Sequence, residues 1–476
     1  MDWIGSFDDA VTEFIKTMKK RFLFMQRLLL VLVGLVCVSH VNAYDFKAEN
    51  QDGVIIYYDC IESIAIVTSG EGQYEGTVRI PATVTNDGIT YEVKLIGPKA
   101  FFNCGALTSV EIPSSVVAIG SFAFYFCLSL KSIDIPCNVM AIGDRAFAEC
   151  QNMESIRLSE GLLSIGAWAF ENNSKVQSVC IPASVTEIGV SAFSGNNAMT
   201  TVSVAQGNSF FDSRNDCNAI IETASNMLIT GCKTTKIPSD IVTIGNCSFN
   251  DCETLASIEI PASVTTIGSS AFSHCRSLES IEIPNSVVSI DDNVFMYCSG
   301  LKTIRLSEGL SSIGKYAFEG CRELQSVYIP ASVKEIGAGV LSENSAMTTI
   351  TVAPENKFYD SRKDCNAIIE TASNTLISGC QKTRIPHGVV AIGKSAFYGC
   401  QNLFSVEIPE TVTGIADYAF FNCGKLKEVV SEIKNPFEID ESVFSSLPED
   451  AVLYVPKGTK EAYESIGGWN IKKSIR

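Results

Sequence analysis

"SIEIPASVTTIGSSAFSHC", residues 257–275, is followed at once by a near copy of itself, "SIEIPNSVVSIDDNVFMYC", residues 280–298. Aligning the isoleucine of the Ile-Gly element extends this register along most of the chain. The spacing is 23 residues except for two intervals of 56, with the isoleucines at Ile96, Ile119, Ile142, Ile165, Ile188, Ile244, Ile267, Ile290, Ile313, Ile336, Ile392 and Ile415. A fixed period over so long a stretch predicts a solenoid, in which each unit stacks on the one before it.

The repeated unit predicts three short segments. Apolar and polar residues alternate in "SIEI", which is typical of a half-buried strand, and Pro261 ends that strand because it has no N–H to donate. "TTIG" predicts a second extended segment, closed by Gly268, which allows a sharp turn. "SSAFSHC" has room for one or two helical turns, with a serine as cap. One unit cannot bury its own apolar face, whereas stacked units can.

The full motif resembles the leucine-rich repeat in its BspA-like form, over residues 95–430. In one copy it is carried by Leu255, Ile258, Ile260, Pro261, Val264, Ile267, Gly268, Ala271, Phe272 and Cys275. The resemblance implies an α/β repeat solenoid, a right-handed curved stack of about 12 units of 23 residues. Its "SIEI" strands would line one long parallel sheet on the concave side. The resemblance also implies a secreted or cell-surface protein that mediates protein–protein interaction or adhesion to host matrix or other cells.

A longer duplication lies on top of the short repeat. Residue n matches residue n+148, as Trp168 matches Tyr316 and Cys104 matches Cys252. Both 56-residue intervals, near 199–236 and 347–384, hold the same insert, in which "NAII" precedes "TASN" and a second apolar run. This pattern predicts a β-hairpin in each insert. Residues 44–94 contain strand-like runs and predict a β-rich N-terminal cap, and residues 431–476 predict a C-terminal cap.

Residues 1–43 are typical of a signal peptide, and we expect translation to start at Met18 or Met25 and cleavage to follow Ala43. The apolar core is shorter than the roughly 20 residues of a membrane-spanning helix, which argues against an anchor of that kind. A lipid-modified Cys37 stays an alternative, although Val36 stands where lipoprotein signals have a small residue. The basic n-region is formed by Lys19, Lys20 and Arg21.

Charge and motif content argue against several function classes. A formal net charge of −17 does not suit nucleic acid, whose phosphates need a basic face. His274 precedes Cys275, but adjacent residues on a short helix point apart, and no catalytic motif is present, so we expect neither an enzyme nor a cofactor. "DSRND" at 212–216 and "DSRKD" at 360–364 suggest calcium but lack the spacing of an EF-hand, and a polar turn with an internal Arg–Asp pair is the preferred interpretation.

The chain has 18 cysteines, and nine of them end a unit: Cys104, Cys127, Cys150, Cys252, Cys275, Cys298, Cys321, Cys400 and Cys423. Other units carry Asn173, Asn196 or Asn344 at this position, so it is a packing position where the side chain meets a backbone group. A straight column does not supply the converging ligands of a metal site. In the hairpins, two pairs are equidistant from the turn, and for both a disulfide and two buried free thiols stay open: Cys217 with Cys232, and Cys365 with Cys380.

The residue between the two isoleucines of "I-x-I" faces outward, and these residues form a stripe along the stack. We call it the outward stripe: Glu111, Asp134, Arg157, Cys180, Ser203, Lys236, Glu259, Glu282, Arg305, Tyr328, Thr351, Arg384, Glu407 and Val430. Its charges alternate in blocks, with cross-strand ion pairs expected for Arg157 with Asp134 and for Arg305 with Glu282. Tyr328 is its one aromatic residue, a residue type that anchors interfaces. A binding surface and a merely solvated face both stay open.

Two function hypotheses follow from the stripe. The first is an extracellular protein that holds an unidentified protein ligand. The alternative is a glycan-binding surface protein, which needs exposed aromatic platforms; of the tryptophans only Trp168 and Trp469 lie beyond the leader.

The leader generates a direct test. Cleavage after Ala43 predicts that the exported protein begins at Tyr44, which N-terminal sequencing or intact-mass measurement of the protein from expressing cells would show. An N-terminal Cys37 carrying lipid would instead establish a lipoprotein.

Overall fold

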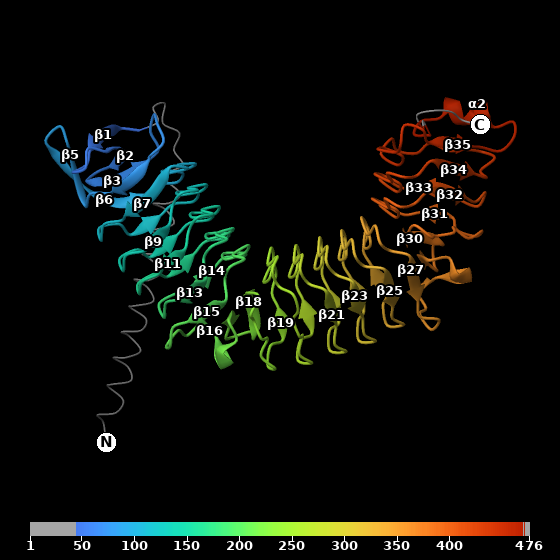
Figure 1. The fold of residues 1–476 in the computed structure, drawn as a ribbon, viewed down its shortest axis with the longest axis horizontal. Coiled ribbons are helices and arrows are strands. Elements are labelled where there is room, and N and C mark those ends of the chain that lie inside the picture. The colour runs from blue at the N-terminus through green and yellow to red at the C-terminus, as the bar shows by residue number, and fades with distance from the viewer. Residues whose placement is uncertain (1–43, 470, 472–476) are drawn as a thin grey trace, which may run out of the picture.

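The computed structural model describes residues 44–469 and residue 471, and it shows a curved solenoid with three segments. In Figure 1 an N-terminal arm, a middle segment and a C-terminal arm together form a wide U. The signal-peptide prediction, including Cys37, falls outside the described residues. Within them, no helix has the length and apolar character needed to cross a bilayer.

The N-terminal arm begins with antiparallel strands and continues as a parallel ladder of Ile-Gly strands. Strand β2 pairs antiparallel with β3, β3 pairs in parallel with β6, and each later Ile-Gly strand pairs in parallel with the one before it. The strands are β1 (Phe46–Glu49), β2 (Ile55–Ile61), β3 (Ile64–Thr68), β5 (Thr83–Asn86), β6 (Ile89–Ile96), β8 (Ala118–Ile119), β10 (Ala141–Ile142), β12 (Ser164–Ile165) and β14 (Glu187–Ile188).

The other two segments each begin in the same way, with an antiparallel hairpin inside the insert. In the middle segment β17 pairs with β18, which then pairs in parallel with β19; in the C-terminal arm β29, β30 and β31 repeat this arrangement. The strands are β16 (Phe211–Asp212), β17 (Ala219–Glu222), β18 (Met227–Gly231), β19 (Thr243–Ile244), β20 (Thr266–Ile267), β22 (Ser289–Ile290), β24 (Ser312–Ile313), β26 (Glu335–Ile336), β28 (Tyr359–Asp360), β29 (Ala367–Glu370), β30 (Thr375–Gly379), β31 (Ala391–Ile392) and β33 (Gly414–Ile415).

The "SIEI" strands do not form one long parallel sheet, so that expectation is wrong. They pair in twos, or in a three at the C-terminus. A physical reason is that proline follows many of these short strands and supplies no N–H to extend the ladder. The strands are β4 (Gly76–Arg79), β7 (Leu107–Glu111), β9 (Ser132–Asp134), β11 (Ser155–Arg157), β13 (Ser178–Ile181), β15 (Thr201–Val204), β21 (Ser280–Glu282), β23 (Thr303–Arg305), β25 (Ser326–Ile329), β27 (Thr349–Val352), β32 (Ser405–Ile408), β34 (Glu428–Ser431) and β35 (Val452–Tyr454).

The "SSAFSHC" segment is not helical, so the α/β description is also corrected. Its backbone includes left-handed residues, as at Phe122 (φ 58°) and Phe126 (φ 61°). The N–H groups of Phe122, Phe124 and Phe126 donate to carbonyls of the next unit at 2.9, 2.7 and 3.1 Å. Backbone groups are thus satisfied between units, not within a helix. The helices of the described residues are α2 (Lys460–Ser465) and two 3-10 turns, Arg214–Asp216 and Arg362–Asp364.

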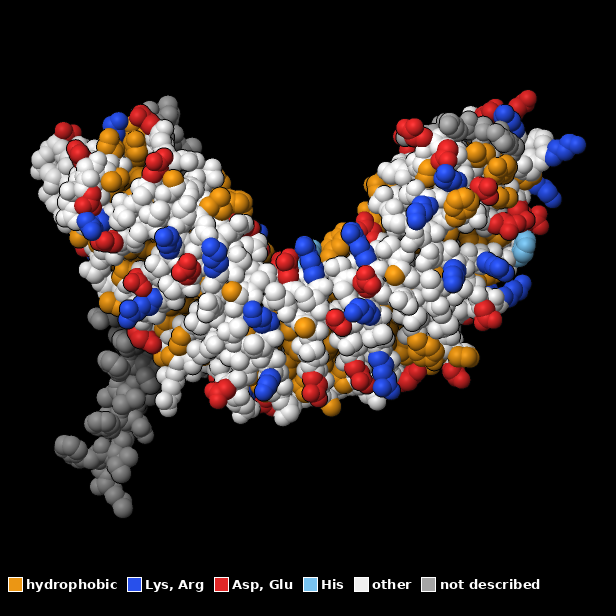
Figure 2. Space-filling view, viewed as in Figure 1, with side chains coloured by type: hydrophobic (Ala, Val, Ile, Leu, Met, Phe, Trp, Pro, Cys, Tyr) orange, Lys and Arg blue, Asp and Glu red, His pale blue; other side chains and the backbone are white. Residues whose placement is uncertain are grey.

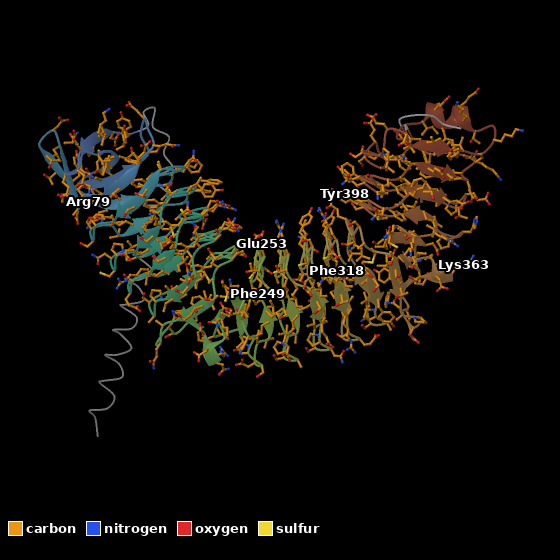
Figure 3. All side chains as sticks on the ribbon, viewed as in Figure 1. Arg79, Phe249, Glu253, Phe318, Lys363 and Tyr398 are labelled. Atoms are coloured by element: carbon orange, nitrogen blue, oxygen red, sulfur yellow. The ribbon has the colours of Figure 1, made fainter. Side chains whose placement is uncertain are left out.

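A column of buried phenylalanines runs through each segment. Phe101 and Phe124 stack with ring centroids 4.7 Å apart and planes 6° apart, and the same arrangement continues at 4.9–5.6 Å along the stacks. Figure 3 shows Phe249 and Phe318 inside the coil. Large rings buried in this way carry much of the apolar burial of each unit.

Six of the nine cysteines that end a unit donate a hydrogen bond to the phenylalanine carbonyl of the unit before: Cys127, Cys150, Cys275, Cys298, Cys321 and Cys423. The Cys298 thiol donates to the Phe272 carbonyl at 3.0 Å, and the Asn173 amide makes the equivalent bond to the Phe147 carbonyl at 3.0 Å. The prediction of a packing position that meets a backbone group is confirmed. Burial raises the pKa of the Cys298 thiol to about 12, so the thiol keeps its proton and stays a donor at neutral pH.

The hairpin cysteines are free thiols in the structure. Of the two alternatives, a disulfide and two buried free thiols, the structure therefore shows the free thiols. A register shift within the hairpin pairs Ala219 with Gly231, which places Cys217 and Cys232 one residue out of register. They therefore point to opposite faces, and Cys232 packs in the core of the N-terminal arm while Cys217 packs in that of the middle segment. The second hairpin repeats this at Cys365 and Cys380.

The two inserts lie at the two bends of the U. Lys363, in the second insert, lies on the outer side of its bend, and Tyr398 lies on the inner edge (Figure 3). There the Glu343 N–H donates directly to the Tyr398 carbonyl at 2.9 Å, although an insert separates the two units in sequence. At the first bend the Glu253 N–H likewise donates to the Asn197 side-chain oxygen, at 2.8 Å. An insert on the outer side with direct contact on the inner side acts as a wedge, and this bends the stack.

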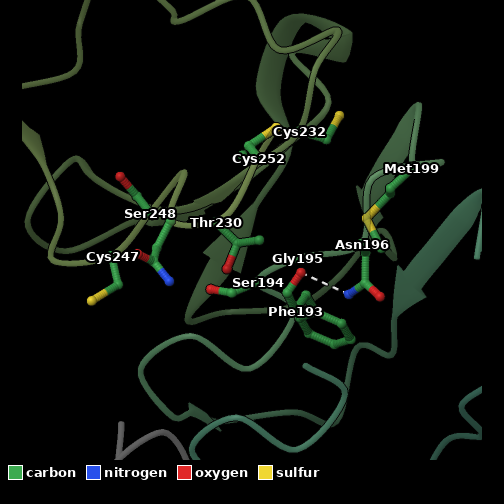
Figure 4. Close-up of a pocket in the computed structure, with 12 residues that line it drawn as sticks. Phe193, Ser194, Gly195, Asn196, Met199, Thr230, Cys232, Cys247, Ser248 and Cys252 are labelled. Atoms are coloured by element: carbon green, nitrogen blue, oxygen red, sulfur yellow. Dashed lines mark hydrogen bonds between the residues drawn. The ribbon is translucent and has the colours of Figure 1, made fainter. Parts of the chain in front are cut away.

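The phenylalanine column is interrupted at the first bend, and Figure 4 shows the residues that line a small cavity there. The hairpin presents Gly231 to the Phe249 ring, where a Cβ would approach to 2.1 Å, so no larger residue fits without displacing the ring. Beside it a cavity of about 10 Å³ is lined by Phe193, Asn196, Cys232 and other residues. This volume is about that of one water, too small for a substrate.

The end-of-unit position predicts a specific order of stabilities. Cys298→Ala removes the bond to the Phe272 carbonyl and leaves a void, and we expect a loss of about 1–2 kcal/mol. Cys298→Asn can remake the bond, so it should lie closer to the wild type. Thermal and denaturant midpoints measure this, with the exposed Cys137→Ala as the control. Equal loss for Ala and Asn at position 298 would contradict the assigned role.

Candidate functional site

The outward stripe points to solvent, as predicted, although three of its members lie outside the strands. The charged members and Tyr328 are all exposed: Glu111, Asp134, Arg157, Lys236, Glu259, Glu282, Arg305, Tyr328, Arg384 and Glu407. The strands that carry most of the stripe cross the flank of the solenoid, and the inner edge of the U is formed by turns such as the one that carries Glu253 (Figures 1 and 3). The expectation that the stripe lies on the concave side is therefore corrected to the flank. Lys236, Glu259 and Arg384 lie outside the strands.

One of the two expected cross-strand ion pairs forms. Arg305 lies 3.2 Å from Glu282 across β23 and β21. Arg157 lies opposite Asp134 in register, yet among the described residues no ion pair joins these two. Arg79 extends the stripe into the cap by pairing with Glu111 at 3.0 Å. All of these side chains are well exposed, so each pair contributes little to stability.

Tyr328 stands beside a hollow on this flank. The hollow has a volume of about 410 Å³ and is lined by Glu282, Pro284, Asn285, Arg305 and Tyr328, among others. The Tyr328 side chain is 47% exposed, so its ring lies outside the core and is open to solvent. The stripe therefore offers an aromatic ring, a cation and an anion around one depression.

The structure does not support catalysis at His274. The Cys275 thiol donates to the Phe249 carbonyl at 3.2 Å and is buried away from the imidazole. Ser273 Oγ lies 2.9 Å from His274 Nδ1, and Asp251 lies 3.7 Å from the same nitrogen. A relay needs the serine and the carboxylate on different ring nitrogens, so these three residues lack that geometry.

The "DSRND" and "DSRKD" turns are held by internal Arg–Asp pairs, and this prediction is confirmed. Arg214 lies 2.7 Å from Asp212 and 2.6 Å from Asp240, and Arg362 lies 2.6 Å from Asp360. Within the described residues, no group of three or more His, Cys, Asp or Glu is placed to hold a metal ion.

Aromatic residues gather in the turn segments, a feature that the sequence reasoning missed. Phe102 stacks on Tyr125 at 5.6 Å, and Tyr125 meets Phe122 edge-on at 5.5 Å. In the C-terminal arm Tyr398 stacks on Phe421 at 5.2 Å, and Phe421 meets Tyr418 edge-on at 5.6 Å. The two triads occupy equivalent units, and Figure 2 shows hydrophobic side chains at several places on the inner edge. The signal was the recurrence of aromatic residues directly after the "AF" pair.

Near the first bend two carboxylates, Glu149 and Glu171, lie close together beside Arg145. Arg145 lies 3.1 Å from Glu171 and stacks on the Trp168 ring at 4.7 Å. Asn172 donates to Glu149 at 2.8 Å. Burial, opposed by Arg145, raises the pKa of the Glu171 carboxyl to about 7.

The second bend holds two carboxylates, Glu319 and Glu343, near Tyr297 and Tyr398. Burial first, and then the negative charge of Glu343, raises the pKa of the Glu319 carboxyl from 4.5 to about 7. The charges of both carboxylates also raise the pKa values of Tyr297 and Tyr398, after burial as the largest cause. Arg322 pairs with Glu343 at 3.7 Å.

The sequence matches the family described as "BspA type Leucine rich repeat region (6 copies)" over residues 89–216, 226–348 and 373–466. Among curated proteins, none matches this chain. Of solved structures, the pneumococcal vaccine antigen PcpA is similar with a TM-score of 0.50 at 18% identity, covering 91% of this chain and 99% of that one. A leucine-rich repeat protein from Bacteroides ovatus covers the same shares at 22% identity and a TM-score of 0.40. The likeness to the pneumococcal antigen is one of fold.

Glu319 makes the stability of the protein depend on pH. Its folded-state pKa of about 7 lies above the ordinary value of 4.5, so between these pH values the folded chain holds a proton that the unfolded chain has lost. Stability is therefore expected to fall as pH rises through this window. Glu319→Gln removes the ionisation and should raise the unfolding midpoint at pH 8 but not at pH 4.5, as measured by thermal melts. The exposed Glu323→Gln is the matched control, and an equal gain in both variants would refute the assignment.

Proposed function

This chain belongs to the BspA-type leucine-rich repeat family, and we propose that it is a secreted or cell-surface protein that adheres to other cells or to extracellular matrix by binding a protein there. Repeat solenoids of this kind present a long surface built from equivalent positions of successive units, which suits binding of an extended partner. The acidic net charge of −17 suits a protein partner and not a nucleic acid. Export is supported by the predicted leader at residues 1–43.

The observation that carries the proposal is the hollow at Tyr328. An exposed aromatic ring beside a depression of about 410 Å³, with Arg305 and Glu282 around it, has the composition of an interface anchor. Arginine and tyrosine are enriched among residues whose loss weakens binding most. The flank also keeps its other outward residues charged and variable from unit to unit, which favours specificity for one partner.

Glycan binding is a second candidate, and a specific observation favours it. The two aromatic triads offer stacked rings, and Phe102 and Tyr418 are 42% and 41% exposed. Sugar rings pack well on such platforms because their C–H faces are apolar. The tryptophans do not contribute a comparable platform, since Trp469 is fully buried and Arg145 lies over the Trp168 ring.

The two candidates predict different losses. Purified full chain would be tested on a panel of immobilised matrix proteins and on a glycan array. Changing Tyr328, Arg305 and Arg157 together to Ala should weaken protein binding by about 2 kcal/mol or more, roughly thirtyfold, because truncating anchor residues has effects of this size. Lys334→Ala, exposed outside the stripe beside β26, is the control.

Unchanged protein binding in the triple variant would remove the stripe from the proposal. Glycan signals that survive the triple variant but vanish in Tyr398→Ala with Phe421→Ala would instead establish the second candidate.

A further inference from the structure

The 148-residue duplication lets the two bends be compared residue by residue. At the first bend Arg145 sits between the Trp168 ring and the Glu171 carboxylate. The equivalent residues at the second bend are Asn293, Tyr316 and Glu319. The backbone is the same, because φ is 53° at Arg145 and 61° at Asn293, and 54° at Trp168 and 55° at Tyr316. The aromatic ring and the carboxylate are kept, and the cation between them is gone.

Glu319 is buried without a partner. The residue is 7% exposed, and among the residues that the structure describes none donates a hydrogen bond to its carboxylate or forms an ion pair with it. An unpaired carboxylate at this burial is costly unless a cation or donor reaches it. In the first copy Arg145 does so at 3.1 Å.

A second exchange adds negative charge to the same place. At the first bend, Asn172 lies against Gly195, where a Cβ would approach the Asn172 side-chain oxygen to 1.8 Å. In the second copy these positions are Gly320 and Glu343. The loss of the asparagine side chain leaves room for a glutamate, so the second bend has two carboxylates in its centre.

Tyrosine side chains lie near these carboxylates. In addition to burial, the negative charges of Glu319 and Glu343 raise the pKa values of Tyr297 and Tyr398. The Glu319 N–H donates to the Tyr316 carbonyl at 3.1 Å. Among the described residues, the cation that pairs with Glu343 is Arg322, which lies at the rim and is 61% exposed. Aromatic faces and carboxylates together form the kind of surroundings that recognise guanidinium and ammonium groups.

We propose that the inner edge of the second bend is a recognition site for a basic side chain, an arginine or lysine presented by a partner protein. This side chain takes the place between Tyr316 and Glu319 that Arg145 occupies at the first bend. The net charge of −17 attracts such a partner at long range. The proposal rests on the proposed function in one respect, namely that the occupant belongs to a protein.

The test uses the full chain and a peptide probe, Gly-Gly-Arg-Gly-Gly with blocked ends, followed by calorimetry or ligand-observed NMR. The same peptide with citrulline, which has the shape of arginine without its charge, is the control ligand. We expect the arginine peptide to bind and the citrulline peptide not to bind. Glu319→Gln should weaken binding roughly tenfold or more, the usual size for one charge-assisted hydrogen bond.

Two reciprocal variants make the test sharper. Asn293→Arg supplies the missing cation from within the chain, so it should abolish peptide binding and raise the melting temperature. Arg145→Asn vacates the first bend, so it should create a second binding site for the same peptide. Peptide binding that persists unchanged in Asn293→Arg, equal binding of the citrulline peptide, or no binding to the wild type at millimolar concentration would each overturn the proposal.

The outcome is separable from that of the proposed function. The variant with Tyr328 and Arg305 changed to Ala should bind the arginine peptide as the wild type does, because both residues lie on the flank. Loss of peptide binding in that variant would overturn the separation of the two surfaces. Asn293→Arg could abolish peptide binding and leave matrix-protein binding unchanged. The basic-side-chain site would then bind a partner other than the matrix protein.

Discussion

The stacking of one phenylalanine on the next is the interaction on which this structure depends. A 23-residue unit is too small to enclose its own apolar side chains, so each unit is stable only with a neighbour against it. The rings of Phe124 and Phe147, 4.9 Å apart and nearly parallel, join one unit to the next. At most of the end-of-unit positions a cysteine or an asparagine hydrogen-bonds the phenylalanine carbonyl of the preceding unit, which fixes the spacing at the same point.

At the two places where the phenylalanine column is interrupted, the stack bends and charged side chains become partly or fully buried. Each insert ends one column, starts a new ladder with a hairpin, and turns the stack, with the insert on the outside and direct unit-to-unit contact on the inside. The half-buried Glu171 and the buried Glu319 lie next to these two interruptions. In the regular stack the same residue types meet in every unit, and the buried positions are apolar or hydrogen-bonded. At a bend, side chains meet whose contact the 23-residue period does not set.

The sequence predicted what the period controls. The register of Ile267, the hydrogen-bonding role of Cys298 and the outward direction of Tyr328 all follow from the position of a residue within its unit, and the structure agrees. It did not predict the left-handed residues of the turn segment, because a non-glycine residue such as Phe122 gives no local sign that neighbouring units will take up its backbone hydrogen bonds. The offset of Cys217 from Cys232 depends on a bulge, and the place of the stripe on the flank depends on the direction of curvature; neither is encoded in the repeat motif.

Because the two inserts set the positions of the bends, the number of units between them sets the distance between the arms of the U. Five units, from Ile244 to Ile336, separate the hairpins, and each adds one strand spacing of about 4.8 Å to the base of the U. Gain or loss of a single unit between the inserts would change the distance between the arms by that step while leaving every local contact intact. Related chains could thus evolve to span targets of different width by unequal recombination within the repeats, without altering a residue that touches the target.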